Sequence, residues 1–185
     1  MRVFARKGYR NTVVEDVAEE AGVGKGTIYT YFDRKEKLLG AVFEGLMAEL
    51  EGREEAILRS DRPPLEKIRA ITHEFVDVIG HQEDGFARVM LDIWTASLRN
   101  PERFGIDFAE LYAEYRILLR DLLREAQAQG DVPADLSSMV PTVLIGAIEG
   151  VLLQWLLDPE SVDFPGRADD IVDLLYRGIE IADGS

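Results

Sequence analysis

Apolar residues recur at helical spacing along most of this chain of 185 residues. Residues 65–79 are an example, in which the apolar positions are Leu65, Ile68, Ile71, Phe75, Val78 and Ile79. Intervals of three and four residues place these side chains on one face of an α-helix. No stretch shows sustained strand-like alternation bounded by hairpin turns such as Asn-Gly. The pattern therefore predicts an all-α fold.

Proline, glycine and capping residues divide this pattern into separate helices. Pro141 is expected either to kink its helix or to mark the effective start of that helix. A loop is expected at residues 80–85. The expected helices lie at residues 13–20, 25–32, 34–58, 64–79, 86–98, 101–129, a segment ending at 157, and 168–182. This order predicts a short N-terminal head, residues 1–40, followed by a helical bundle, residues 41–185.

The head has the internal spacing of a helix-turn-helix. Thr12 and Glu15 fit a capping box at the start of a short helix, and Gly22 suits the turn that ends it. Ala18 is small where the two helices would cross. Ile28 and Phe32 lie four residues apart and would face inward. The residues left near the outer or flanking faces of the second helix are Lys25, Thr27, Tyr29, Thr30 and Tyr31.

Three interpretations of this segment can be compared. A nucleotide-binding P-loop requires GxxxxGK[ST], and residues 24–27 lack that glycine spacing. A purely structural helix pair explains Ala18 and Gly22 but not three aromatic residues within four positions of a short helix. A surface that enters the major groove of DNA accounts for both features, because hydroxyl and ammonium groups bond to phosphates and base edges.

The charge distribution agrees with the third interpretation. The net charge is -14, yet the first 40 residues carry eight Lys or Arg against six Asp or Glu. The acidic remainder of the chain would repel phosphates, so only the N-terminal end could approach DNA.

Four segments of the head resemble the DNA-binding domain of TetR family transcriptional regulators. They are FARKGY (residues 4–9), TVVEDVA (12–18), AGVGKGTIYTYF (21–32) and KEKLL (35–39). The resemblance implies a ligand-responsive regulator, most often a repressor, that releases a palindromic operator when a small molecule binds. It also implies that DNA is contacted by Thr12, Lys25, Gly26, Thr27, Tyr29, Thr30, Tyr31 and Lys35.

The sequence departs from the family pattern at two places. Family members usually have more residues of the first helix before the counterpart of Phe4, so we expect a truncated first helix. They also often have Ser before the counterpart of Lys25. Gly24 is a weaker N-cap at that position.

The expected helix that ends at residue 157 and the expected helix at residues 168–182 have more apolar surface than one bundle needs. Thr142, Gly146 and Gly150 recur at four-residue steps and would let another helix approach closely. The resemblance implies a homodimer formed by these helices, with an interface of Thr142, Gly146, Gly150, Leu153, Leu157, Ile171, Leu174 and Leu175. A fully buried central helix in a monomer is the alternative.

The resemblance also implies an effector cavity among the middle helices, which are rich in aromatic residues. The expected effector is apolar or aromatic, with His73, Tyr112 or Gln154 as polar anchors. The candidate pocket residues are His73, Phe75, Phe86, Met90, Trp94, Phe108, Tyr112, Tyr115 and Gln154. Taken singly, each aromatic residue is more typical of a core.

Other chemistry is less well supported. Cysteine is absent, His73 and His81 have no acidic partners at metal-ligand spacing, and no catalytic motif is found. We therefore expect neither a metal, a cofactor nor an enzyme, and no membrane association of this cytoplasmic protein. The alternatives are a helical small-molecule-binding protein with a head impaired in DNA binding and, more remotely, an all-α enzyme.

Overall fold

The computed structural model describes residues 2–81 and 86–179; for His81, Phe86 and Pro101 it describes the backbone only. The described residues form helices and no strand, which confirms the predicted all-α class. They divide into two compact units. The first comprises Met1–Glu49 with Gln82–Phe108, and the second comprises Leu50–His81 with Ala109–Ser185.

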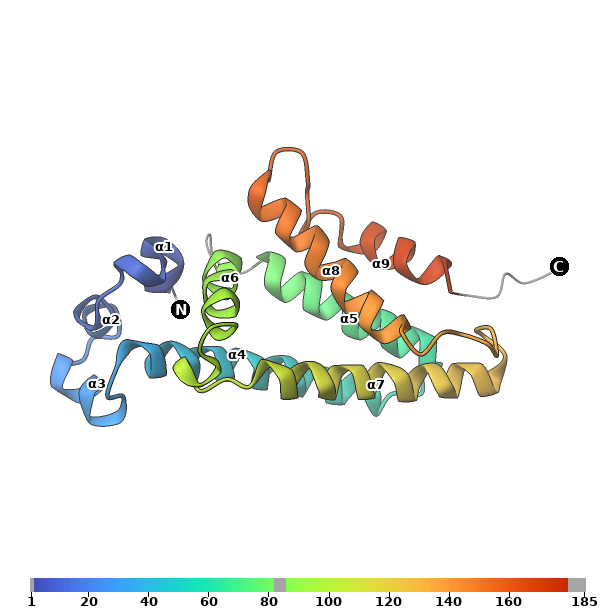
Figure 1. Ribbon diagram of the computed structural model, residues 1–185, viewed down its shortest axis with the longest axis horizontal. Coiled ribbons are helices and arrows are strands. Elements are labelled where there is room, and N and C mark those ends of the chain that lie inside the picture. The colour runs from blue at the N-terminus through green and yellow to red at the C-terminus, as the bar shows by residue number, and fades with distance from the viewer. Residues whose placement is uncertain (1, 82–85, 180–185) are drawn as a thin grey trace. The chain divides into compact units, whose positions relative to one another are not determined.

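The first unit contains the helix-turn-helix (Figure 1). Its elements are α1 (Arg2–Asn11), α2 (Val14–Glu20), α3 (Lys25–Tyr31), the start of α4 (Lys35–Leu58), α6 (Phe86–Ser97) and the 3-10 turn η1 (Pro101–Arg103). Helix α1 packs against α6. Phe4, Leu39, Ile93 and Phe104 are almost completely buried and form much of the core of this unit.

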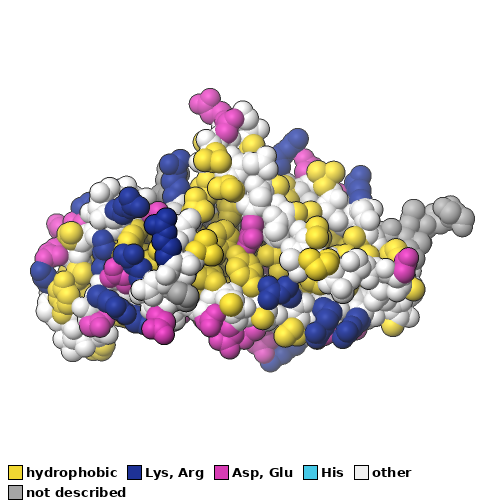
Figure 2. All heavy atoms as spheres, viewed as in Figure 1, with side chains coloured by type: hydrophobic (Ala, Val, Ile, Leu, Met, Phe, Trp, Pro, Cys, Tyr) yellow, Lys and Arg dark blue, Asp and Glu magenta, His cyan; other side chains and the backbone are white. Residues whose placement is uncertain are grey.

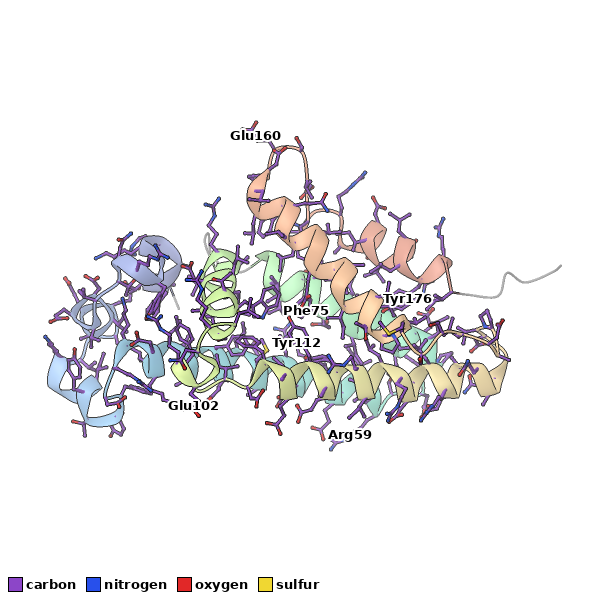
Figure 3. All side chains as sticks on the ribbon, viewed as in Figure 1. Arg59, Phe75, Glu102, Tyr112, Glu160 and Tyr176 are labelled. Atoms are coloured by element: carbon purple, nitrogen blue, oxygen red, sulfur yellow. The ribbon has the colours of Figure 1, made fainter. Side chains whose placement is uncertain are left out.

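The second unit is a helical bundle. Its elements are the end of α4, α5 (Pro64–His81), α7 (Phe108–Gln129), α8 (Val140–Leu157) and α9 (Ala168–Arg177). Helices α5 and α9 pack together, and the Tyr176 side chain of α9, labelled in Figure 3, is fully buried. Its hydroxyl forms a 2.7 Å hydrogen bond with the hydroxyl of Thr72 on α5. Burial and this pairing keep the two helices in register.

Most predicted helices are present, but three boundaries differ, two of them around α5 and α7. Asn100 and Pro101 begin the 3-10 turn η1 and not the long helix that their capping pattern predicted. Gly105 follows with φ 81°, a conformation that ends the turn, and α7 begins only at Phe108. Helix α5 continues through Gly80 to His81, so the loop predicted from residue 80 was wrong at its start; residues 82–85 lie outside the described residues.

The predicted ends of the last two helices stand as follows. Pro141 lies in the first turn of α8 and marks its start. Helix α9 ends at Arg177, earlier than the predicted 182, and residues 180–182 lie outside the described residues. The predicted division of the chain after residue 40 falls within α4 and stays a prediction.

Candidate nucleic-acid interface

The turn between α2 and α3 is closed by backbone hydrogen bonds. Val23 donates its amide to the Ala18 carbonyl at 3.0 Å, and Gly22 donates to Glu19 at 3.1 Å. These are the two bonds of a Schellman motif, which requires a left-handed residue at Gly22. Gly22 has φ 66°, as its predicted role requires. The turn therefore fixes the direction in which α3 leaves α2.

One face of α3 is buried and the other is open. Ile28 is 8% exposed and packs inward, whereas Tyr29 is 45% and Tyr31 77% exposed. Lys25, Gly26, Thr27 and Thr30 are exposed as well, although the Thr30 hydroxyl donates to the Gly26 carbonyl of its own helix. Six of the eight residues predicted to contact DNA thus share one short exposed helix.

Thr12 does not fit its predicted roles. It is completely buried, and its hydroxyl donates to the Gly8 carbonyl at 2.8 Å, so it cannot touch DNA in this structure. The predicted capping box is also wrong by one residue. Val13 is the N-cap of α2, and its amide donates to the carboxylate of Asp16 at 3.1 Å. Thr12 instead closes the end of α1, where Gly8 interrupts the helix with φ 75°.

Lys35 lies where α4 begins, and its ammonium is turned toward α1. Its Nζ donates to the carbonyl oxygens of Thr12 at 2.7 Å and Tyr9 at 2.8 Å, and lies 4.5 Å from the centre of the Tyr9 ring. A cation at carbonyls left unpaired by a helix end is favourable. Lys35 therefore stabilises the head in this structure, and its contact with phosphate stays a prediction.

The carboxylates of α2 pair with most cations around them. Lys7 binds Asp16 at 2.6 Å, and Lys25 forms an ion pair with Glu15. The hydrogen bond from Lys25 lowers the pKa of Glu15, and that from Lys7 lowers the pKa of Asp16. Sequence patterns did not indicate this pairing, because it joins residues nine and ten positions apart on different helices.

A second polar cluster connects η1 with the head. Tyr9 donates its hydroxyl to Glu36 at 2.5 Å, and Arg103 reaches both the Tyr9 hydroxyl at 3.2 Å and Glu36 at 3.3 Å. Burial, followed by the hydrogen bond to Glu36, raises the pKa of Tyr9 to about 12. The Tyr9 ring also meets Phe104 edge-on with centroids 5.5 Å apart. The segment after α6 is thus tied to α1 and α4.

The candidate effector residues of the second unit include two tyrosines on α7. Tyr112 donates to Glu149 on α8, and Tyr115 donates to Glu54 on α4 at 2.7 Å. Burial raises the pKa of both carboxylic acids. Figure 3 shows Phe75 on α5 and Tyr112 on α7 directed into the region between these helices.

The two predicted polar anchors other than Tyr112 lie elsewhere in this unit. His73 is 3.1 Å from Asp169 and lines an open groove with Arg62 and Arg69. Gln154 is exposed and donates its amide to the Gly150 carbonyl. Among the described residues no group of three or more His, Asp or Glu could hold a metal ion.

The remaining candidate effector residues belong to the first unit. The rings of Trp94 and Phe108 are in edge contact, with centroids 6.4 Å apart. Met90, which precedes Trp94 on α6, is buried. The side chain of Phe86 lies outside the described residues. The structure thus groups the candidates by unit, and their role in effector binding stays a prediction.

Helix α8 carries an apolar stripe that its own unit leaves uncovered. Four apolar residues of the stripe, Met139, Val143, Leu153 and Leu157, are between 42% and 76% exposed, with Gly146 and Gly150 completing a spacing of alternating fours and threes. Hydrophobic side chains gather over α8 in Figure 2. Within the described residues α8 is also the helix long and apolar enough to span a membrane, by length and composition alone.

The other candidate interface residues differ in their exposure to solvent. Thr142 is exposed, and Leu174 on α9 is 76% exposed. Ile171 is half-buried, and Leu175 packs partly against the core of its own unit.

Comparison with known proteins identifies the family. Residues 1–42 match the bacterial regulatory proteins of the TetR family, and residues 64–175 match the C-terminal domain of BetI-type transcriptional repressors. The HTH-type transcriptional repressor KstR2 of Mycolicibacterium smegmatis is 31% identical over 83% of this chain and 73% of the relative. The chain belongs to the TetR family and is a ligand-responsive, DNA-binding transcriptional repressor by class.

Two solved structures share the fold over nearly the whole chain. The regulator FadR from Bacillus subtilis in complex with stearoyl-CoA has a TM-score of 0.78 at 25% identity, covering 96% of this chain and 94% of that one. A transcriptional regulator from Saccharomonospora viridis in complex with choline has a TM-score of 0.83 at 23% identity, covering 97% and 93%.

Proposed function

We propose that two copies of this chain bind a palindromic operator through α3 and release it when a small molecule binds the helical bundle. The observation that carries the proposal is the division of α3 into a buried face at Ile28 and an open face at Tyr29 and Tyr31. The major groove admits a helix of this kind, whose hydroxyls and ammonium reach base edges and phosphates.

The proposed DNA contacts are made by one exposed helix with a preset direction. We assign them to Lys25, Gly26, Thr27, Tyr29, Thr30 and Tyr31. Lys and Arg side chains gather over α1 in Figure 2, in the same unit as α3. Ion pairs with α2 carboxylates partly neutralise these cations, so they would add only a weak sequence-independent attraction to the phosphate backbone.

The uncovered stripe of α8 supports a homodimer. Alternating steps of four and three residues are the spacing of a helix–helix seam, and the exposed Leu174 of α9 would extend it. Gly146 and Gly150 leave the α8 backbone open to a close partner. A two-fold dimer would place the α3 helices about 34 Å apart, one turn of B-DNA.

The effector would be bound in the bundle, where the candidate contacts are Phe75, Tyr112 and Tyr115. The carboxylic acids of the buried Glu54 and the half-buried Glu149 add to the expected chemistry, since each has a tyrosine hydroxyl as partner. A ligand with a hydrogen-bond donor or positive charge next to its apolar part would compensate a buried carboxylate. We therefore propose an apolar or aromatic effector with such a group.

Release of DNA requires that the effector favour one arrangement of the heads. A ligand shifts an equilibrium only by its differential affinity for the two states. The Tyr9–Glu36–Arg103 cluster supports such coupling, because it attaches the segment that leads into α7 to the head. The protein would act in the cytoplasm by binding and not by catalysis.

Selection from a pool of random duplexes tests the DNA-binding half of the proposal. The recovered sequences should share a palindrome with half-sites about one helical turn apart, and the affinity should fall steeply with salt. Recovery of no common sequence would contradict it. For the effector, stearoyl-CoA and choline serve as two chemically distinct probes in thermal-shift and DNA-release assays; the buried acids predict a larger effect from the cation.

A further inference from the structure

The first residue of α3 is held by an acidic side chain of α2. Lys25 Nζ donates a hydrogen bond to Glu15 Oε1, and the same ammonium lies 5.5 Å from the centre of the Tyr29 ring. The side chains of Lys25 and Glu15 are 50% and 51% exposed. The pair is therefore solvent-facing and adjoins the open face of α3.

Glu15 is one of several α2 carboxylates that neutralise cations of the head. Asp16 pairs with Lys7 of α1 at 2.6 Å, and Glu20 lies 3.4 Å from Arg2 and 3.6 Å from Arg6. Among these pairs, the one formed by Glu15 involves a proposed DNA contact. Glu19, on the same helix, is exposed and has no ion-pair partner within the described part of the chain.

A phosphate is a strong competitor for such an ammonium. Exposed ion pairs are weak, equivalent to a factor of about two to five in an equilibrium constant. Binding of a cation to duplex DNA is driven by the release of condensed counterions. The Glu15 carboxylate neutralises much of the charge that Lys25 would offer to a phosphate, and Glu15 would itself repel the DNA backbone.

We propose that Glu15 competes with DNA phosphate for Lys25 and so lowers the affinity of the head for DNA of any sequence. The proposal rests on the proposed function, in which Lys25 contacts phosphate. Glu15 then sets how readily the repressor occupies sequence-independent sites. The base-reading side chains Thr30 and Tyr31 are not part of this exchange.

A double-mutant cycle tests the exchange on a mixed-sequence duplex of about 30 base pairs, roughly three turns. The variants are Glu15→Gln, Lys25→Gln and the double variant, with Glu19→Gln as the matched control because it makes the same charge change on the same helix. Affinities are measured between about 50 and 200 mM salt. Thermal unfolding of each variant confirms that the head is intact.

The expected result is that Glu15→Gln raises the affinity about two- to five-fold, more than Glu19→Gln does. In the Lys25→Gln background this gain should shrink to that of the control. An equal gain from the two glutamates, a gain that persists without Lys25, or a loss of affinity would each overturn the proposal. If the unmodified protein shows no salt-dependent duplex binding, the proposed function itself fails, which is a different outcome from any of these.

Discussion

Gly40 and Phe104 approach so closely that a Cβ atom on Gly40 would overlap the Phe104 carbonyl oxygen. This contact lies where α4 passes the turn that follows η1. The same turn supplies Arg103 to Tyr9 and Glu36, so one close approach positions a polar cluster that includes the end of α1. A small residue at position 40 is therefore a structural requirement of the first unit.

Replacing Gly40 with Ala should destabilise the first unit by about 1–3 kcal/mol, because the obstructing atom belongs to the backbone and cannot rotate away. Thermal unfolding measures the effect. Gly45→Ala is the matched control on the same helix, where no atom lies within 4 Å of the added carbon. The control should gain about 0.5–1 kcal/mol from the lost flexibility of glycine. Equal stability of the two variants would contradict the close contact.

Lys35 is predicted to stabilise the folded head even in the absence of DNA. Lys35→Met removes three hydrogen bonds to carbonyl oxygens at and just beyond the end of α1. We expect a loss of about 1–2 kcal/mol in the free energy of unfolding. Arg34→Met, an exposed cation one residue earlier, should stay within about 0.5 kcal/mol of the parent. A melting temperature unchanged by Lys35→Met would return this lysine to a purely DNA-contacting role.

The α8 stripe gives a prediction about assembly. A side chain added at Gly146 meets no atom within 4 Å in its own chain, so Gly146→Leu should leave the folded subunit intact. In a dimer it would push the partner helix away, and dimerisation and operator binding should weaken together. Sedimentation compares it with Gly45→Leu on α4, which is equally open. A dimer unaffected by Gly146→Leu would exclude this seam.

The raised pKa of Glu54 predicts how the stability of the fold depends on pH. Burial raises the pKa of Glu54 in the folded chain above its unfolded value, so the folded state holds the proton more tightly. Its contribution is fully present below the unfolded pKa of about 4.3 and is lost as pH rises through the raised folded pKa. Glu54→Gln should therefore be stabilised relative to the parent more at pH about 8 than at pH about 5.

Glu44→Gln is the control for this measurement, since Glu44 is an exposed acid on the same helix. Unfolding in urea at the two pH values compares the variants. A difference between Glu54→Gln and the parent that does not change with pH would show that the carboxylate of Glu54 is not desolvated.

The sequence predicted the head well because its determinants are local. Ala18, Gly22 and Ile28 lie close together in sequence, on α2, the turn and α3, and each occupies the position that its size or backbone freedom indicates. The break between η1 and α7 was missed because Asn100 and Pro101 form a good start for a helix. Gly105, with φ 81°, is the signal that could have located it.

Local sequence patterns could not predict the polar Tyr–Glu pairs of the second unit. Tyr115 and Glu54 are 61 residues apart, and Tyr112 and Glu149 are 37 apart, so only the packing of three helices brings them together. For Thr12 a local pattern was present but indicated the wrong role. Its hydroxyl fits a capping pattern in sequence, but the break at Gly8 turns it inward to close the preceding helix.

The outward face of α3 is tested most directly by the affinity of Tyr31→Ala for the duplex recovered by selection. Tyr31 is 77% exposed, so its loss should leave the melting temperature nearly unchanged while affinity falls about ten-fold, as for a lost base contact. Leu98→Ala, which truncates an 86% exposed side chain of the same unit outside α3, is the control. Tight binding retained by Tyr31→Ala, equal to that of the control, would contradict the assignment of α3 as the helix that reads DNA.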